Sequence, residues 1–127
     1  MTKKKTLFLL ILIGILLIAL SNGLYIRHSA EEMLDAINAL QEKLLDGDFD
    51  RARGELNAVE SAFLENAPYW QALQPHDHVG EIYKYFYYVR GAFNAQDLDR
   101  TRLYLLQMEY AVWDVLTLNK TAPENVF

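Results

Sequence analysis

The strongest constraint on the fold is a long apolar segment directly behind a basic N-terminus. Residues 7–20 are aliphatic or aromatic apart from Gly14, and these fourteen residues would rise only about 21 Å as a helix. The hydrocarbon core of a bilayer is roughly 30 Å thick. Continuing through the weakly polar residues 21–23 to Ile26 gives 20 residues, the length that a membrane-spanning helix needs. The sequence therefore predicts one N-terminal transmembrane helix.

Lys3, Lys4 and Lys5 predict the orientation of this helix. Basic residues stay on the cytoplasmic side, so the chain after Arg27 is expected outside the cytoplasm, as the domain of a single-pass membrane protein. The alternative is a secreted protein whose signal peptide is cleaved, because residues 19–21 offer small side chains to a signal peptidase. We therefore divide the chain into residues 1–28, a cytoplasmic basic start with an anchor or signal peptide, and residues 29–127, an extracytoplasmic domain.

Composition excludes several classes of function for the exported part. The chain has 12 Lys and Arg against 17 Asp and Glu. Without the three N-terminal lysines the balance is 9 against 17, a formal charge of −8. Such a charge repels phosphate backbones, and no clustered basic face opposes it, so we expect no nucleic-acid binding. The chain contains no cysteine, which excludes disulfides, thiolate metal sites and a Cys nucleophile.

Residues 29–127 show apolar side chains at three- and four-residue spacing, the pattern of amphipathic helices, and no alternation of period two. Ser29 and Glu32 form a capping box, so the first helix of the domain is expected to start there. Gly47 can end that helix in the left-handed conformation, and Asp48 can cap the next one. The first two apolar stripes comprise Met33, Ile37, Leu40 and Leu44, then Phe49, Ala52, Leu56, Val59 and Phe63.

The second half of the domain resembles the first at an offset of 49 residues. Residues 48–56 match residues 97–105 at five of nine positions, and helices are expected to start near Asp77 and Asp97. The predicted fold class is all-α: an N-terminal transmembrane helix followed by an antiparallel four-helix bundle made of two repeated helical hairpins. The last two apolar stripes comprise Val79, Ile82, Phe86, Val89 and Phe93, then Leu98, Leu105, Met108, Val112 and Leu116.

Pro68 and Pro75 are expected to bracket a connection between the two hairpins. In a bundle that leads away from the membrane, this connection returns to the bilayer, whereas the short turns lie at the far end. Tyr69 and Trp70 would then lie near the lipid surface, where amphipathic rings are favoured. Both are candidate contact residues.

The sequence contains one group that resembles a metal-binding site, made of His76, Asp77, His78 and Glu81. Imidazoles and carboxylates cluster in this way at zinc and related sites. Alternate residues of a loop need not converge, however, and Asp77 can already serve as a helix cap. We therefore predict no metal and no other cofactor, and keep His76, His78 and Glu81 as candidate ligands. The sequence has neither a Ser nucleophile elbow nor a Gly-rich phosphate loop, so no enzyme is expected.

The segment of residues 83–88 is almost entirely aromatic, with the sequence Tyr-Lys-Tyr-Phe-Tyr-Tyr. Six positions cover more than one helical turn, so a helix that buries Phe86 must turn some tyrosines elsewhere. One interpretation is that these rings widen the core of a small bundle. The other is a surface for a partner or for self-association, since Tyr offers both area and a hydroxyl group. The candidate interaction residues of this segment are Tyr83, Tyr85, Tyr87 and Tyr88.

The chain resembles the domain-of-unknown-function family 4363, small proteins of Gram-positive bacteria with a hydrophobic N-terminus and a helical remainder. The similarity rests on the apolar segment from Leu7, on Trp70, on the segments 78–82 and 97–105, and on the terminal Asn-Val-Phe of residues 125–127. It spans nearly the whole chain. The resemblance implies an exported, membrane-associated helical protein and assigns no activity.

Together these features predict an interaction or scaffolding module without enzymatic activity, held at the outer face of a membrane. Its expected partner is another membrane protein or a second copy of the chain. The alternative function is an extracytoplasmic ligand- or metal-binding domain that uses the region of His76 and His78.

Overall fold

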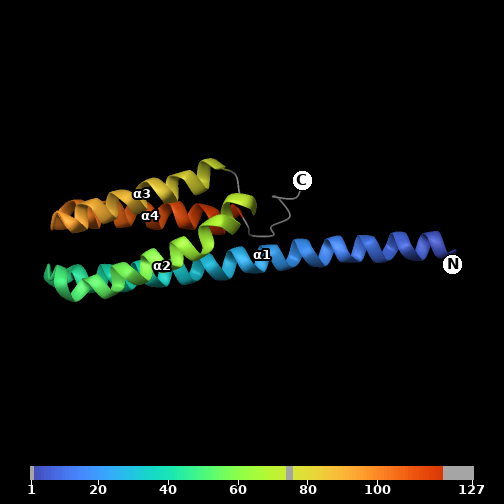
Figure 1. Cartoon of the computed structure of the whole chain (residues 1–127), viewed down its shortest axis with the longest axis horizontal. Coiled ribbons are helices and arrows are strands. Elements are labelled where there is room, and N and C mark those ends of the chain that lie inside the picture. The colour runs from blue at the N-terminus through green and yellow to red at the C-terminus, as the bar shows by residue number, and fades with distance from the viewer. Residues whose placement is uncertain (1, 74–75, 119–127) are drawn as a thin grey trace.

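The computed structural model describes residues 2–73 and 76–118, and within these ranges it contains helices and no strand. Figure 1 shows α1 and α2 along each other in one layer and α3 and α4 in a second. The predicted all-α class is confirmed for the described residues. The elements are α1 (Lys3–Lys43), the 3-10 turn η1 (Leu44–Asp46), α2 (Phe49–Leu73), α3 (His76–Asn94) and α4 (Leu98–Leu118).

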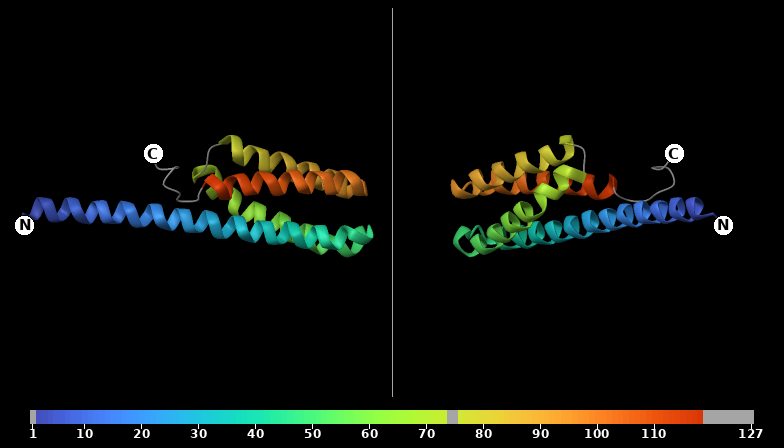
Figure 2. Two further views of the ribbon diagram at one scale, coloured as in Figure 1. Left: turned by 180° about the vertical axis from the view of Figure 1, so that it is seen from behind. Right: turned by 45° about the vertical axis from the view of Figure 1, so that its right-hand side comes forward.

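The first helix is a single unbroken element of 41 residues. Its N-terminal half projects beyond the other helices (Figure 2), and its large apolar side chains between residues 7 and 20 are 45–69% exposed. Such a surface is costly in water and favourable in lipid. Within the described part of the chain, this is the one helix long and apolar enough to cross a membrane.

The predicted helix start at Ser29 is wrong, because Ser29 lies inside α1. Its hydroxyl donates backwards to the carbonyl oxygens of Tyr25 (2.8 Å) and Ile26 (3.0 Å), a bond that a serine can make within a helix. Glu32 lies beside His28 (3.2 Å between Oε1 and Nε2) instead of capping the chain at Ser29. No glycine or proline between residues 24 and 46 interrupts the helix, so the apolar segment and the domain share one axis.

The predicted connection that starts at Pro68 is also wrong, because α2 continues through Pro68 to Leu73. Proline lacks the amide that would bond to the carbonyl of Leu64, and its ring bends a helix without always ending it. Figure 1 shows α2 bending toward its C-terminal end, away from α1. Tyr69 and Trp70 therefore belong to a helix, and Pro75 lies outside the described residues.

One turn in each layer joins its two helices, and the two turns are built alike. Gly47 (φ 72°) and Gln96 (φ 55°) have the left-handed conformation that ends a helix, as predicted for Gly47. Asp48 Oδ1 then accepts a bond from the amide of Arg51, and Asp97 Oδ1 accepts one from the amide of Arg100, each at 3.2 Å. Both aspartates act as N-caps, which confirms the predicted starts of α2 and α4.

The core lies between the two layers. α1 contacts α2 and α4, while α3 contacts α4 and α2. Phe63 of α2 stacks on Phe86 of α3 with 4.7 Å between ring centroids, which ties the layers together. Every apolar stripe residue predicted from the sequence is buried, except Phe49 and Leu98, which are half-buried against the core.

This core predicts the effect of shortening Phe63. We expect Phe63→Ala to lower the free energy of unfolding by about 3–5 kcal/mol, because it leaves a cavity and removes the contact with Phe86. The matched change Leu64→Ala, at a side chain that is 52% exposed, should cost less than about 0.5 kcal/mol. Denaturant unfolding of the full chain in micelles, followed by tryptophan fluorescence, measures both. Equal effects would contradict the assigned core.

Candidate functional site

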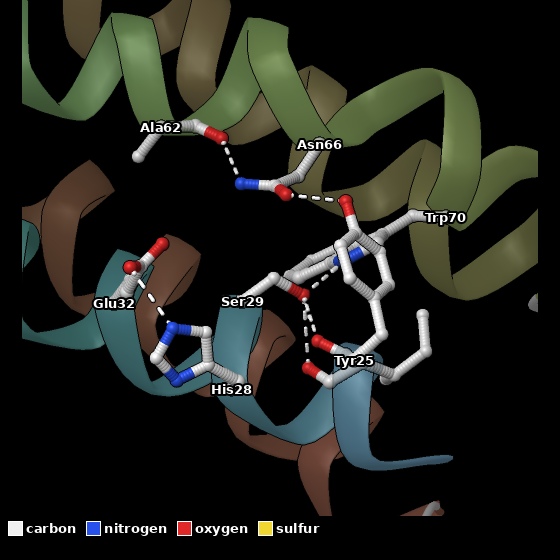
Figure 3. A network of polar contacts seen from close by, with 8 residues as sticks. Tyr25, His28, Ser29, Glu32, Ala62, Asn66 and Trp70 are labelled. Carbon is white, nitrogen blue, oxygen red and sulfur yellow. Dashed lines mark hydrogen bonds and ion pairs between the residues drawn. The ribbon is translucent and has the colours of Figure 1, made fainter. Parts of the chain in front are cut away.

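A polar cluster joins α1 and α2 next to the apolar half of α1, and its members are buried except for Tyr25, which is half-buried. It consists of Tyr25, Ser29, Asn66 and Trp70 and is shown in Figure 3. The Tyr25 hydroxyl donates to Asn66 Oδ1 (2.5 Å), and the Trp70 indole Nε1 donates to Ser29 Oγ (2.8 Å). The two bonds lie four residues apart along each helix, so they fasten one full turn of α1 to one turn of α2.

The remaining groups of this polar cluster are bonded within their own helices. The Asn66 amide donates to the carbonyl of Ala62 (2.7 Å), which leaves its oxygen free to accept from Tyr25. Ser29 donates to carbonyls of α1 and accepts from Trp70. Among the described residues, no buried side-chain nitrogen or oxygen lacks a hydrogen-bond partner. The buried polar atoms of the cluster are therefore satisfied within the protein and need no ligand.

The structure separates Tyr69 from Trp70, which the sequence analysis treated as one contact surface. Trp70 is 1% exposed and belongs to the core, so it cannot present its ring to a partner or to lipid. Tyr69 is exposed and meets the edge of Tyr25, with 5.6 Å between ring centroids. A helix turns neighbouring side chains by about 100°, which explains why one ring is buried and the next is not.

The α3 tyrosines also divide between core and surface. Tyr83 is half-buried and packs edge-on against Phe63 (4.6 Å between centroids), so it widens the core. Tyr87 and Tyr88 are 48% and 47% exposed. Tyr85 is half-buried at the boundary with α4. Packing in the core thus accounts for Tyr83, whereas the exposure of Tyr87 and Tyr88 leaves them as candidate interaction residues.

A tyrosine cluster crosses from α3 to α4. Tyr85 contacts Tyr88 (6.2 Å between centroids), and Tyr88 contacts Tyr104 of α4 (5.2 Å). The Lys84 amine lies over the Tyr85 ring at 4.7 Å and within 3.2 Å of Glu81, whose hydrogen bond raises the pKa of Lys84. We call Tyr85, Tyr88 and Tyr104 the tyrosine cluster. Their rings are held by one another, so a partner would meet them already ordered.

Tyr87 lies on the other side of α3, beside Arg90. The Arg90 guanidinium lies 5.1 Å from the Tyr87 ring centroid and 3.9 Å from a carboxylate oxygen of Glu60 on α2. These contacts tie Tyr87 to the boundary between α2 and α3. It does not join the tyrosine cluster.

The metal candidates all lie at the start of α3, which is a helix and not a loop. Positions 76 and 78 are therefore about 200° apart around the helix axis, so this arrangement spreads them instead of bringing them together. Glu81 already contacts Lys84. Across the side chains of residues 2–73 and 77–118, no group of three or more His, Asp or Glu could hold a metal ion. The geometry gives the metal hypothesis no support.

Sequence reasoning missed the polar cluster because it assigned Ser29 to a helix cap. A signal was present, since Asn66 falls between Phe63 and Trp70 on the apolar stripe of α2. A polar residue at a core position needs a buried partner. The 41-residue separation of both bonded pairs could not be read from the sequence.

The polar cluster predicts a coupled pair of substitutions. Ser29→Ala should lower the free energy of unfolding by about 1–3 kcal/mol, because the buried indole N–H of Trp70 loses its acceptor. Adding Trp70→Phe to this variant should cost less than Trp70→Phe does alone, with a coupling of about 0.5–3 kcal/mol. Denaturant unfolding of the four proteins measures the cycle. Strict additivity would show that the bond contributes nothing.

Comparison with known proteins finds no match for this chain. No family model matches it, and neither does a curated protein or a solved structure. The resemblance to the domain-of-unknown-function family 4363 stays a prediction from the sequence.

Proposed function

We propose that this protein is a membrane-anchored module that binds another protein outside the cytoplasm and catalyses no reaction. The observation that carries the proposal is the tyrosine cluster, in which Tyr88 is exposed and packs against the half-buried rings of Tyr85 and Tyr104. Tyrosine is enriched at protein interfaces, because a rigid ring with a hydroxyl group gives contact area at low entropic cost. The partner is another membrane protein or a second copy of the chain.

We further infer that α1 and α2 form one hairpin, that α3 and α4 form a second copy of it, and that the two pack as an antiparallel four-helix bundle. Three observations support this. Each turn has one left-handed residue, Gly47 or Gln96, directly before the aspartate that caps the next helix. The helices contact one another in the order that a bundle requires. Buried positions also coincide at the offset of 49 residues, as in Ala52 with Thr101, Leu56 with Leu105, Val59 with Met108 and Phe63 with Val112.

The membrane orientation is the first part of the proposal to test. Residues 1–28 would form the basic start and the anchor, and residues 29–127 the external domain. Lys3, Lys4 and Lys5 support an internal N-terminus. The unbroken α1 supports an anchor retained in the mature protein, because cleavage after residue 19 or 21 would leave the polar cluster at a frayed helix end.

The absence of cysteine allows a clean labelling experiment. We expect Ser61→Cys, on the exposed side of α2, to react with a membrane-impermeant maleimide on intact cells. The matched variant Thr2→Cys should react only after the membrane is permeabilised. Intact mass then reports whether the N-terminal segment is retained. Labelling of position 2 on intact cells, with position 61 protected, would show the opposite orientation and refute the proposal.

A second experiment tests the contact surface. A photo-crosslinking phenylalanine analogue at position 88 should give adducts in intact membranes, because that ring is exposed within the tyrosine cluster. The same analogue at position 64, on the exposed side of α2, is the matched control. Adducts at both positions in equal yield, or at neither, would remove the tyrosine cluster as the contact surface.

A further inference from the structure

The outer face of α4 carries a second apolar stripe, which points away from the core. Leu103, Leu106, Tyr110 and Trp113 follow at spacings of three, four and three residues, and their side chains are 41–62% exposed. This spacing aligns them along one side of the helix, like the a and d positions of a heptad. The buried side of the same helix, which includes Met108, packs into the core. α4 is thus apolar on two sides.

The outer α4 face continues onto both neighbouring helices. Leu45, in the turn after α1, and Leu106 line one groove beside α4. Tyr85 of α3 and Tyr110 line a second groove on the other side. The apolar surface therefore spans three elements and borders the tyrosine cluster. A contiguous exposed surface of this kind is typical of an interaction site, whereas single exposed apolar residues are not.

Carboxylates border this face on both sides. Glu42 lines the first groove, and Glu109 of α4 lies on the same side, where it accepts a bond from Gln41 (3.2 Å). Asp114 lines the second groove. Glu109 and Asp114 form no ion pair with any residue of the described ranges. Among the described residues, Arg102 is the one basic side chain that lines these two grooves, so the surplus charge beside the stripe is negative.

We infer that the outer α4 face docks a helix of another polypeptide, one with an apolar seam and Lys or Arg on its flanks. This inference rests on the proposed function and adds the chemistry of the partner. The four apolar side chains would take the seam of that helix, since they have heptad spacing. Glu109 and Asp114 would meet its basic flanks, so the attraction between opposite charges would select the partner.

A second copy of the chain fits this face less well. Two copies anchored in one membrane stand the same way up, so their α4 helices would run parallel. Across a parallel heptad seam, flanking residues five positions apart meet each other. Glu109 of one copy would then face Asp114 of the other, and these like charges repel. The overall charge of −8 beyond the N-terminal lysines adds to the repulsion.

A lipid surface also fits this face less well. Figure 1 shows α4 running alongside α1, so a stripe along α4 is parallel to the axis of the anchoring helix. An amphipathic helix that binds lipid lies in the plane of the interface. With α1 across the membrane, the apolar stripe of α4 runs perpendicular to the membrane plane. The outer α4 face therefore suits a partner helix that runs parallel to α4.

The test uses the full chain in nonionic micelles and fluorescent peptides of three heptads as probes. The first peptide has Leu at its a and d positions and Lys at e and g, and the second has Glu at e and g. A third has the composition of the first in scrambled order. We expect the first peptide to bind at least about tenfold more tightly than the other two, as measured by fluorescence anisotropy.

Substitutions locate the binding. The double variant Leu106→Ser, Tyr110→Ser should weaken binding of the first peptide at least about tenfold, because it removes two central apolar contacts. The matched control is Leu64→Ser on α2, which should change binding less than about twofold. The variant Glu109→Lys, Asp114→Lys should reverse the preference between the Lys and Glu peptides. The unfolding midpoints of all variants serve as the check on the fold, because most of these side chains are exposed and Glu109 is half-buried.

Each other outcome overturns the inference. Equal binding of the ordered and scrambled Lys peptides would reduce the interaction to charge alone. A dimer in light scattering that the Leu106→Ser, Tyr110→Ser variant abolishes would assign the face to a second copy. Binding that appears only after deletion of residues 119–127 would assign it to that segment of the chain. Crosslinking at position 88 and the labelling experiment succeed or fail independently, so they distinguish failure of this inference from failure of the proposed function.

Discussion

The unbroken helix α1 is the constraint on which the rest of the structure depends. Its apolar half projects beyond the other helices with its side chains exposed, and its second half supplies one side of the core. The hydrogen bonds that join Tyr25 and Ser29 to side chains of α2 lie where these two halves meet. Because α1 is continuous through both halves, the direction of the N-terminal segment sets the direction of the first helix of the domain. Any surface of the domain therefore has a fixed direction relative to the axis of α1, and this limits how a partner can approach.

Most of the core could be predicted because heptad-like spacing survives in all four helices. The two errors, at Ser29 and Pro68, have a common physical origin. Both residues are strong local signals for a helix end, and both are overridden by tertiary contacts that the sequence does not reveal. Ser29 finds an acceptor inside α1 and a donor in Trp70. The last turn of α2 is held by Trp70, which keeps the helix intact beyond Pro68.

The exposed surfaces were harder to predict than the core. A run of tyrosines indicates an unusual helix, but which rings face outward depends on where the neighbouring helices lie. Tyr83 is held by Phe63 of α2, whereas Tyr88 meets Tyr104 of α4. The outer α4 face was not predicted from the sequence, because the buried stripe on the opposite side of α4 already explains why this helix is apolar. Leu103 and Leu106 look like scattered surface residues until the opposite side of α4 is known to be buried.

The two exposed surfaces are chemically different, and this difference bears on how such a module would select a partner. The tyrosine cluster offers ring faces and hydroxyl groups, which tolerate many partners. The outer α4 face would also orient a bound helix along its line of apolar side chains. Its carboxylates, Glu109 and Asp114, would favour a helix with positive charge. A module tethered to a membrane meets its partners at high local concentration, so weak and unspecific contacts would saturate easily. Selectivity must then come from repulsion as well as attraction, and acidic flanks beside an apolar seam supply both.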